Sequence, residues 1–402
     1  MAYYVVPLVT VPYLSRVLGP ASWGLLAMAQ AFALYGALIV DYGFIFSASR
    51  QIVNATSKQE IEKVIADVLG AKVLLACTVG VAAVIAYRFV PLFHEHPVLL
   101  SAAMCSEVIK ALLPQFYFFG IRRVAFSSML DILSRLAASI GIFIFVHHPR
   151  DAWRVFALQG IGGLLAAGIG TGMMYSRYRF SWPRLRRSVT MLQEGGAMFL
   201  FRSAYHVFSL GNAFVLGLFA PAQDVGYYAG AEKINSAAVG LLSPLSTALY
   251  PHSTALIKDS FEQAVRLTKT SLVVMCGIGL ALMLFMWAGS GLIVSIILGS
   301  KYVPSAAAFR VLSLRAPMLA WTNVLGFQWL LALGLEKSFQ RVTVMALVIN
   351  FALAAILAPR FTYVGMGWAV VASQAAMVLG VYFVLRRRKL NPLSIAVEPS
   401  HA

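Results

Sequence analysis

Apolar runs of about 20 residues alternate along the chain with short segments that carry most of its charged residues. This is the length that an α-helix needs to cross a bilayer, and it differs from the ten-residue alternating segments of outer-membrane strands. The pattern predicts an all-α integral membrane protein with about 12 transmembrane helices. Their expected ranges are 1–18, 24–48, 63–88, 98–119, 124–146, 154–176, 193–219, 226–250, 267–288, 305–333, 340–358 and 364–385.

The second half of the chain repeats the layout of the first. Gly24 is followed six positions later by Gln30 in an apolar run, and Gly226 is followed at the same spacing by Glu232. Gly120 and Gly334 open further apolar runs at matching places in the two halves. These features predict two six-helix bundles related by an axis along the membrane normal, an arrangement in which substrate binds between the halves.

The composition excludes an ordinary soluble domain. Hydrophobic residues make up 60% of the chain and charged residues only 12%, whereas a soluble domain has about 25% charged residues. The mean hydropathy is +0.80. The net charge of +17 lies mainly at predicted helix ends, so it indicates topology rather than nucleic-acid binding. The three cysteines lack metal-ligand spacing, and the apolar first residues do not predict a cleaved signal peptide.

Basic residues concentrate in every second connection between the predicted spans and after the last span. The positive-inside rule then places both termini in the cytoplasm, together with the connection 177–192. We therefore predict four segments: an N-terminal lobe 1–176, a basic cytoplasmic linker 177–192, a C-terminal lobe 193–386 and a cytoplasmic tail 387–402. The linker fits an anchor on anionic lipid headgroups better than a docking site for a partner enzyme.

Some basic residues fall inside the predicted spans or close to their ends. A charge at a helix centre costs at least about 2.5–3.5 kcal/mol, so such residues usually face the bundle interior or a water-filled cavity. Acidic residues at comparable depth are fewer, and this excess of cations indicates an anionic cargo. The basic residues are Lys72, Lys110, Arg135, Arg202, Lys233, Arg310 and Arg315, and the acidic residues are Asp41, Glu107, Asp131 and Glu232.

Spacing separates these residues by expected role. Lys110 lies three positions after Glu107, and Arg135 lies four positions after Asp131, so each pair is expected to neutralise itself on one helix face. A second set, Lys72, Arg310 and Arg315, is expected to extend from span ends to lipid headgroups.

Arg202 has no acidic residue at helical spacing, so a lumen-facing side chain and a structural one are equally compatible with the pattern. Asp41 and Glu232 each allow two interpretations. Either carboxylate could bind a coupling cation or proton, or could form an ion pair with a basic residue on another helix.

No motif of a soluble enzyme is present. The sequence lacks a phosphate-binding GxxxxGK[ST] loop, an HExxH zinc motif and a Gly-rich dinucleotide turn after a strand. We expect no catalytic residues, no metal and no cofactor. A transporter driven by an ion gradient, the membrane potential or the cargo gradient fits better than an enzyme.

Several segments resemble the Wzx-type O-antigen flippases, which belong to the polysaccharide transporter branch of the multidrug/oligosaccharidyl-lipid/polysaccharide superfamily. The resemblance extends over nearly the whole chain. After Gly120 the family often carries an acidic residue, where this chain has two arginines, whereas Glu336-Lys337 keeps the pattern in the second half. The matching segments are 7–20 with Gly24, 41–44, 47–50, 114–120, 225–233, 244–246 and 250–251.

The resemblance implies a two-lobe, MATE-like transporter in the bacterial inner membrane. Such flippases move undecaprenyl-pyrophosphate-linked oligosaccharide repeat units from the cytoplasmic to the periplasmic leaflet, for O-antigen or a related polysaccharide. Polysaccharide polymerase and chain-length proteins are plausible partners. The alternative is a cation-coupled multidrug or small-molecule exporter of the same superfamily. The candidate anion contacts are Arg16, Arg50, Arg123, Arg202 and Lys233, and the candidate coupling carboxylates are Asp41 and Glu232.

Overall fold

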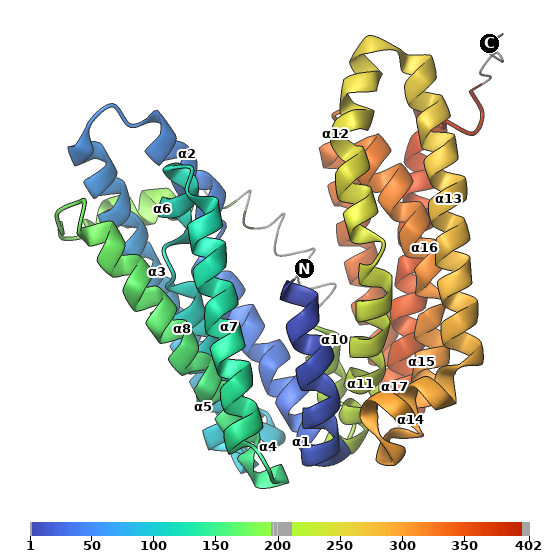
Figure 1. The fold of residues 1–402 in the computed structure, drawn as a ribbon, viewed down its shortest axis with the longest axis horizontal. Helices are drawn as coiled ribbons and strands as arrows, with labels where there is room; N and C mark the ends of the chain where they lie inside the picture. Colours follow the sequence, from blue (N-terminus) through green and yellow to red (C-terminus); the bar gives the residue numbers. More distant parts are fainter. Residues whose placement is uncertain (1, 194–195, 197–198, 200–210, 396–402) are drawn as a thin grey trace. The chain divides into compact units, whose positions relative to one another are not determined.

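The computed structural model describes residues 2–193, 196, 199 and 211–395, and every element in that part of the chain is helical. The chain forms two compact units, Met1–Leu218 and Phe219–Ala402 (Figure 1). The lobe boundaries predicted around 177–192 stay a prediction. The first unit contains α1 (Ala2–Asp41), α2 (Phe44–Asn54), α3 (Lys58–Phe89), α4 (Pro91–Glu95), α5 (Pro97–Ala111), α6 (Gln115–Gly120), α7 (Val124–Phe145), α8 (Ala152–Tyr175) and α10 (Asn212–Gly217).

The second unit contains two long helices and several short ones. Seven helical stretches of the described chain are long and apolar enough to cross a membrane, five in the first unit and two in the second. The helices of the second unit are α11 (Ala222–Gly240), α12 (Ser243–Asp259), α13 (Phe261–Ala288), α14 (Ser290–Leu298), α15 (Ser305–Ser313), α16 (Arg315–Thr322) and α17 (Glu336–Arg387).

The longest helices of the two units each change direction at one residue. In α1 this residue is Gly19, whose φ of 70° lies in a region that glycine adopts without a steric penalty. In α17 it is Thr362, with φ 46° and ψ −124°. The kinks fall between the first and second predicted spans and between the eleventh and twelfth.

The two arms of α17 pack against each other as an antiparallel hairpin. Asn350 donates a hydrogen bond to the hydroxyl of Ser373 at 3.2 Å, and a Cβ on Gly380 would lie 2.7 Å from Val342. A Cβ on Gly365 would lie 2.3 Å from the carbonyl oxygen of Leu357, so the reversal needs glycine at that position.

Three predicted spans contain a break between helices. The span 98–119 breaks between α5 and α6, where Pro114 has no N–H to continue the helix. The span 226–250 breaks between α11 and α12, which carries Pro244 in its first turn. The span 305–333 consists of α15, α16 and a π-helical segment, Asn323–Leu330, with Pro317 near the start of α16. A proline has no N–H to donate to the preceding helical turn, and at these three places one helix ends and the next begins close to the proline.

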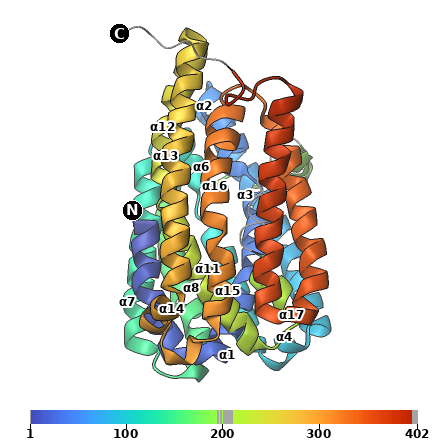
Figure 2. The same cartoon turned by 90° about the vertical axis from the view of Figure 1, so that its right-hand side faces the viewer.

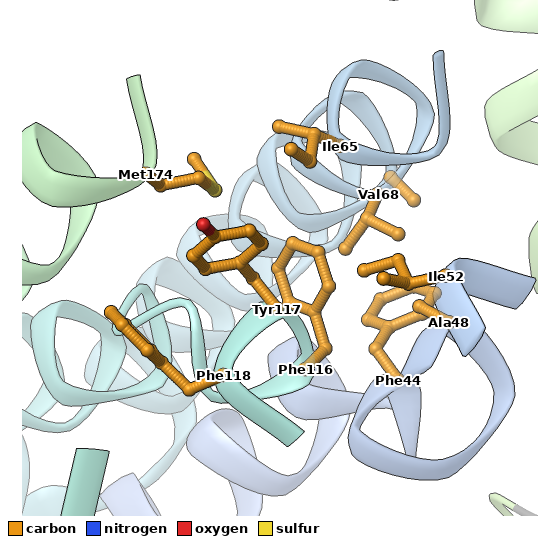
Figure 3. Packing of buried hydrophobic residues seen from close by; sticks show 10 residues of the cluster. Phe44, Ala48, Ile52, Ile65, Val68, Phe116, Tyr117, Phe118 and Met174 are labelled. Atoms are coloured by element: carbon orange, nitrogen blue, oxygen red, sulfur yellow. The ribbon is translucent and has the colours of Figure 1, made fainter. Parts of the chain in front are cut away.

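Aromatic side chains of α2 and α6, which lie at one end of the first unit (Figure 1), form a core whose packing is shown in Figure 3. Phe116 and Tyr117 of α6 are each 1% exposed and pack among residues of α2 and α3. Gly120 allows α6 to approach α2 closely, since a Cβ there would lie 2.7 Å from Ile52. The aromatic segment therefore fixes α2, α3 and α6 together in the interior of the unit.

Close contact between α13 and α16 organises the second unit (Figure 2). Gly279 of α13 faces the backbone of α16, and a Cβ there would lie 2.9 Å from both the Ala316 carbonyl oxygen and the Pro317 Cα. Backbone atoms cannot give way as a flexible side chain can. Small residues at helix contacts of this kind are typical of membrane proteins.

We predict that Gly279→Val lowers the thermal stability of the purified protein, by about 1–3 kcal/mol, because the added side chain separates α13 from α16. Gly277→Val on the same helix is the matched control, since a Cβ at Gly277 meets nothing within 4 Å. The measurement is thermal unfolding in detergent. Equal unfolding temperatures for the two variants would contradict the packing described here.

Candidate functional site

A buried lysine joins α3 to the end of α5 in the first unit. Lys72 is 2% exposed, and its Nζ donates a hydrogen bond to the carbonyl oxygen of Ala111. Nζ also lies 3.5 Å from Oδ1 of Asp41 and 5.9 Å from the centre of the Phe116 ring. The expectation that Lys72 extends to lipid headgroups was wrong.

The break in α5 gives the physical reason. Ala111 is the last residue of α5, and the N–H of Gln115 bonds to Leu113 rather than continuing the helical pattern to Ala111. The Ala111 carbonyl is therefore one of the acceptors that a helix C-terminus leaves for another donor. An ammonium group suits this position because it also opposes the negative end of the helix dipole. Lys72 thus caps α5 from a neighbouring helix.

Asp41 takes part in this arrangement from the end of α1. Its side chain is 56% exposed, while that of Lys72 is 3% exposed, so the pair joins a solvent-exposed carboxylate to a buried ammonium. Of its two interpretations, the ion pair with a basic residue on another helix is the one that the geometry displays. A coupling role for Asp41 stays a prediction.

The two predicted intrahelical pairs are confirmed. Lys110 lies 2.6 Å from Glu107, and its Nζ also donates to the Gln159 side chain at 2.9 Å. Arg135 Nε lies 3.0 Å from the Asp131 carboxylate. Because each of these cations has a local counter-charge, neither contributes an uncompensated charge for cargo binding.

The candidate anion contacts do not form one cluster in the described residues. Arg50 on α2 and Arg123, which precedes α7, are exposed at the end of the first unit that holds the aromatic core. Arg16 is exposed on α1 and lies near the opposite end of the unit. Its neighbour Tyr13 marks this position, since the Tyr13 hydroxyl donates a hydrogen bond to the carbonyl of Val146, just after the C-terminus of α7. The 22 residues of α7 span about 33 Å between these ends.

The remaining candidates divide between the second unit and undescribed residues. Lys233 is exposed and Glu232 half-buried on α11. Arg202 lies outside the described residues. Arg310 is exposed and donates a hydrogen bond to the Ser290 hydroxyl of its own unit at 2.6 Å. Arg315 is half-buried, and its Nε has no hydrogen-bond partner among the described residues.

An open apolar groove of about 670 Å³ lies between α3 and α5 in the first unit. Ala76, Gly80 and Ala83 of α3 and Ser101 and Cys105 of α5 line it, with larger apolar side chains between them. These small residues leave the space. None of the candidate charged residues lines the groove, and no cluster of metal-ligating side chains occurs in the described part of the chain.

Asp67 is a charged residue that the sequence reasoning missed. It lies on α3, is 7% exposed, and accepts a hydrogen bond from the backbone N–H of Arg184 in the linker. Two features of the sequence could have pointed to it: Asp67 lies at the edge of an apolar run, and the linker 177–192 further along the chain is rich in arginine.

Solved structures identify the class of fold. A lipid II flippase MurJ in an inward closed conformation superposes with a TM-score of 0.77 at 14% identity, covering 95% of this chain and 85% of that chain. An inward-facing multidrug resistance MATE family transporter of the MOP superfamily gives 0.68 at 15% identity, covering 98% and 100%. The fold is therefore that of MOP-type membrane transporters.

The family follows from the sequence. Residues 1–257 match the family model described as polysaccharide biosynthesis protein, and the chain belongs to that family. A "Putative O-antigen transporter" of Escherichia coli (strain K12) is 27% identical over 393 residues, which cover 96% of this chain and 94% of the relative. A protein of the same description from Shigella dysenteriae is 25% identical, covering 96% and 97%.

We predict that Asp41 and Lys72 are energetically coupled. Asp41→Ala alone leaves the buried ammonium of Lys72 with one partner fewer. In the double variant, Lys72→Met has already removed that charge, so the loss of Asp41 should cost less. Thermal unfolding of the two single variants and the double variant should give a coupling of about 0.5–3 kcal/mol. Additive effects would show that the 3.5 Å contact contributes nothing to stability.

Proposed function

We propose that this protein is a flippase for undecaprenyl-pyrophosphate-linked oligosaccharide repeat units, acting in O-antigen or related polysaccharide biosynthesis. The observation that carries the proposal is the near full-length similarity to two curated proteins described as putative O-antigen transporters. Membership of the polysaccharide biosynthesis protein family and the transporter fold agree with it. Transport rather than catalysis is the activity.

The charge balance supports an anionic cargo. The chain carries 32 Lys and Arg against 15 Asp and Glu. Glu107 and Asp131 neutralise basic neighbours on their own helices, so these two carboxylates do not make the interior acidic. A pyrophosphate group needs cationic partners in a low-dielectric environment, and the guanidinium fork binds phosphate oxygens in pairs. The candidate contacts are Arg16, Arg50, Arg123, Arg202 and Lys233.

We further propose about 12 membrane crossings, in two six-helix lobes, with both termini in the cytoplasm of a bacterial inner-membrane protein. The kinks in α1 and α17 support more crossings than the seven helical stretches found in the described residues, since each kink divides one continuous helix into two arms. Arg16 and Arg50 lie at opposite ends of the first unit, so they would act at different stages of transport. The polymerase and chain-length proteins of the same biosynthesis are the proposed protein partners.

A cation-coupled exporter is the second candidate, because a MATE family transporter shares the fold. Cationic drugs would favour an acidic cavity, which is opposite to the balance of charge in this chain. Drug susceptibility of a deletion strain separates the two functions directly.

The proposed function is tested by deleting the gene in a strain without a second flippase and measuring surface polysaccharide together with lipid-linked repeat units. Externally added glycosidase reports which leaflet holds those units. We expect surface polymer to disappear while protected lipid-linked units accumulate. Unchanged polymer with unprotected units would reject this cargo.

We predict that Arg202→Ala abolishes surface polymer while the protein still inserts at normal abundance, because the anion loses a cationic partner. Arg202→Lys separates charge from fork geometry and should restore only part of the polymer. The control is Lys301→Ala, which removes an exposed charge in a connection of the second unit. Normal polymer with Arg202→Ala would remove this residue from the proposed site.

A further inference from the structure

The basic linker 177–192 is held against the first unit by specific contacts. The backbone N–H of Arg179 donates to the Glu62 carboxylate at 2.8 Å, and the Ser181 hydroxyl donates to the Glu62 carbonyl at 3.3 Å. Tyr178 packs edge-on against buried Tyr117, with ring centres 5.7 Å apart. These contacts fix the first part of the linker on α3 and on the aromatic core.

The second part of the linker is fixed by Asp67 and Gly70 of α3. Asp67 accepts the backbone N–H of Arg184, immediately before the helical residues 185–193. The carboxylate thus lies at the N-terminus of this helix, where negative charge is stabilising. Pro183 and the buried Ser188 press on Gly70, where a Cβ would come within 2.6 Å of both side chains. The linker is therefore a docked element with defined inner and outer faces.

The outer face combines exposed apolar and basic side chains. Phe180 is 58% exposed, Trp182 83% and Leu185 70%, and the Phe180 and Trp182 rings contact each other at 5.4 Å. The linker sequence contains no acidic residue. Its arginines are all exposed, namely Arg177, Arg179, Arg184, Arg186 and Arg187.

The depth of this face follows from the helices that carry it. The linker begins two residues after the end of α8 at Tyr175, and its contacts with Glu62, Asp67 and Gly70 all lie in the part of α3 that precedes Lys72. Beyond Lys72, α3 carries no charged residue until Arg88. The outer face therefore lies where a membrane-spanning helix leaves the hydrocarbon, the level at which tryptophan and arginine side chains are favoured.

We propose that the outer face of residues 177–192 binds the anionic phospholipid headgroups of the adjoining leaflet, with Trp182, Phe180 and Leu185 inserted at the headgroup boundary. The charge is complementary to such a surface, and the exposed aromatic side chains distinguish it from a basic patch that is merely solvated. The contacts with Glu62 and Asp67 hold the exposed stretch that carries both kinds of side chain against the first unit. This inference does not depend on the proposed cargo.

Thermal unfolding of the full-length protein in detergent tests the charge complementarity, with phosphatidylglycerol or phosphatidylcholine added. We expect phosphatidylglycerol to raise the unfolding temperature of the unmodified protein. The triple variant Arg177→Gln, Arg179→Gln, Arg186→Gln should lose more than half of that shift. The matched control removes three exposed charges from the end of α17: Arg386→Gln, Arg387→Gln and Arg388→Gln. An unchanged shift in the linker variant, or an equal loss in the control, would overturn the proposal.

A fluorescent probe at position 182 tests insertion. Trp182→Cys is made in a background where Cys77, Cys105 and Cys276 are serine, labelled with an environment-sensitive fluorophore and placed in nanodiscs. We expect blue-shifted emission and quenching by bromine-labelled lipids, both stronger with phosphatidylglycerol than with phosphatidylcholine alone. The control is His148→Cys, because the His148 side chain is 79% exposed and lies just beyond the C-terminus of α7, at the other end of the first unit from the linker. This position should show no such dependence on headgroup charge. Emission typical of water at position 182 in both lipids would mean that the face serves an acidic macromolecule or solvent instead.

Discussion

A bilayer offers no water to the polar groups of a spanning helix, so each backbone carbonyl and each charge must find its partner within the protein. Lys72 illustrates how this constraint shapes the first unit. Its ammonium caps α5 at Ala111, where the helix breaks, and it pairs with Asp41 at the end of α1. Three helices are thereby joined through one buried cation. Lys110 and Arg135 meet the same constraint within their own helices.

The sequence pattern located the apolar runs, but it did not show how the helices within them bend or break. Length and hydropathy locate an apolar run, but they do not reveal a change of direction such as those at Gly19 and Thr362, which depend on backbone conformation. The breaks before α6, α12 and α16 each lie close to a proline, namely Pro114, Pro244 and Pro317. Which proline bends a helix and which begins a new one depends on tertiary contacts.

Charged residues were predictable where their partner was local. The pairs at Lys110 and Arg135 follow from helical spacing alone. Lys72 was assigned to the lipid headgroups because its partners, Asp41 and the Ala111 carbonyl, lie far away in sequence. Asp67 was missed for the same reason, since its partner is a backbone N–H in the linker. The excess of cations within the spans indicated an anionic cargo, and the family resemblance added that this cargo is a lipid-linked oligosaccharide. The near full-length relatives support that assignment.

The most direct test of the account is transport by the purified protein. Proteoliposomes that contain undecaprenyl-pyrophosphate-linked oligosaccharide in both leaflets would be treated with an external glycosidase, and the fraction digested would be followed over time. A flippase exposes the inner pool, so digestion should proceed from about half of the oligosaccharide toward completion with active protein. Digestion that stops at the outer-leaflet fraction, as in protein-free liposomes, would contradict the account.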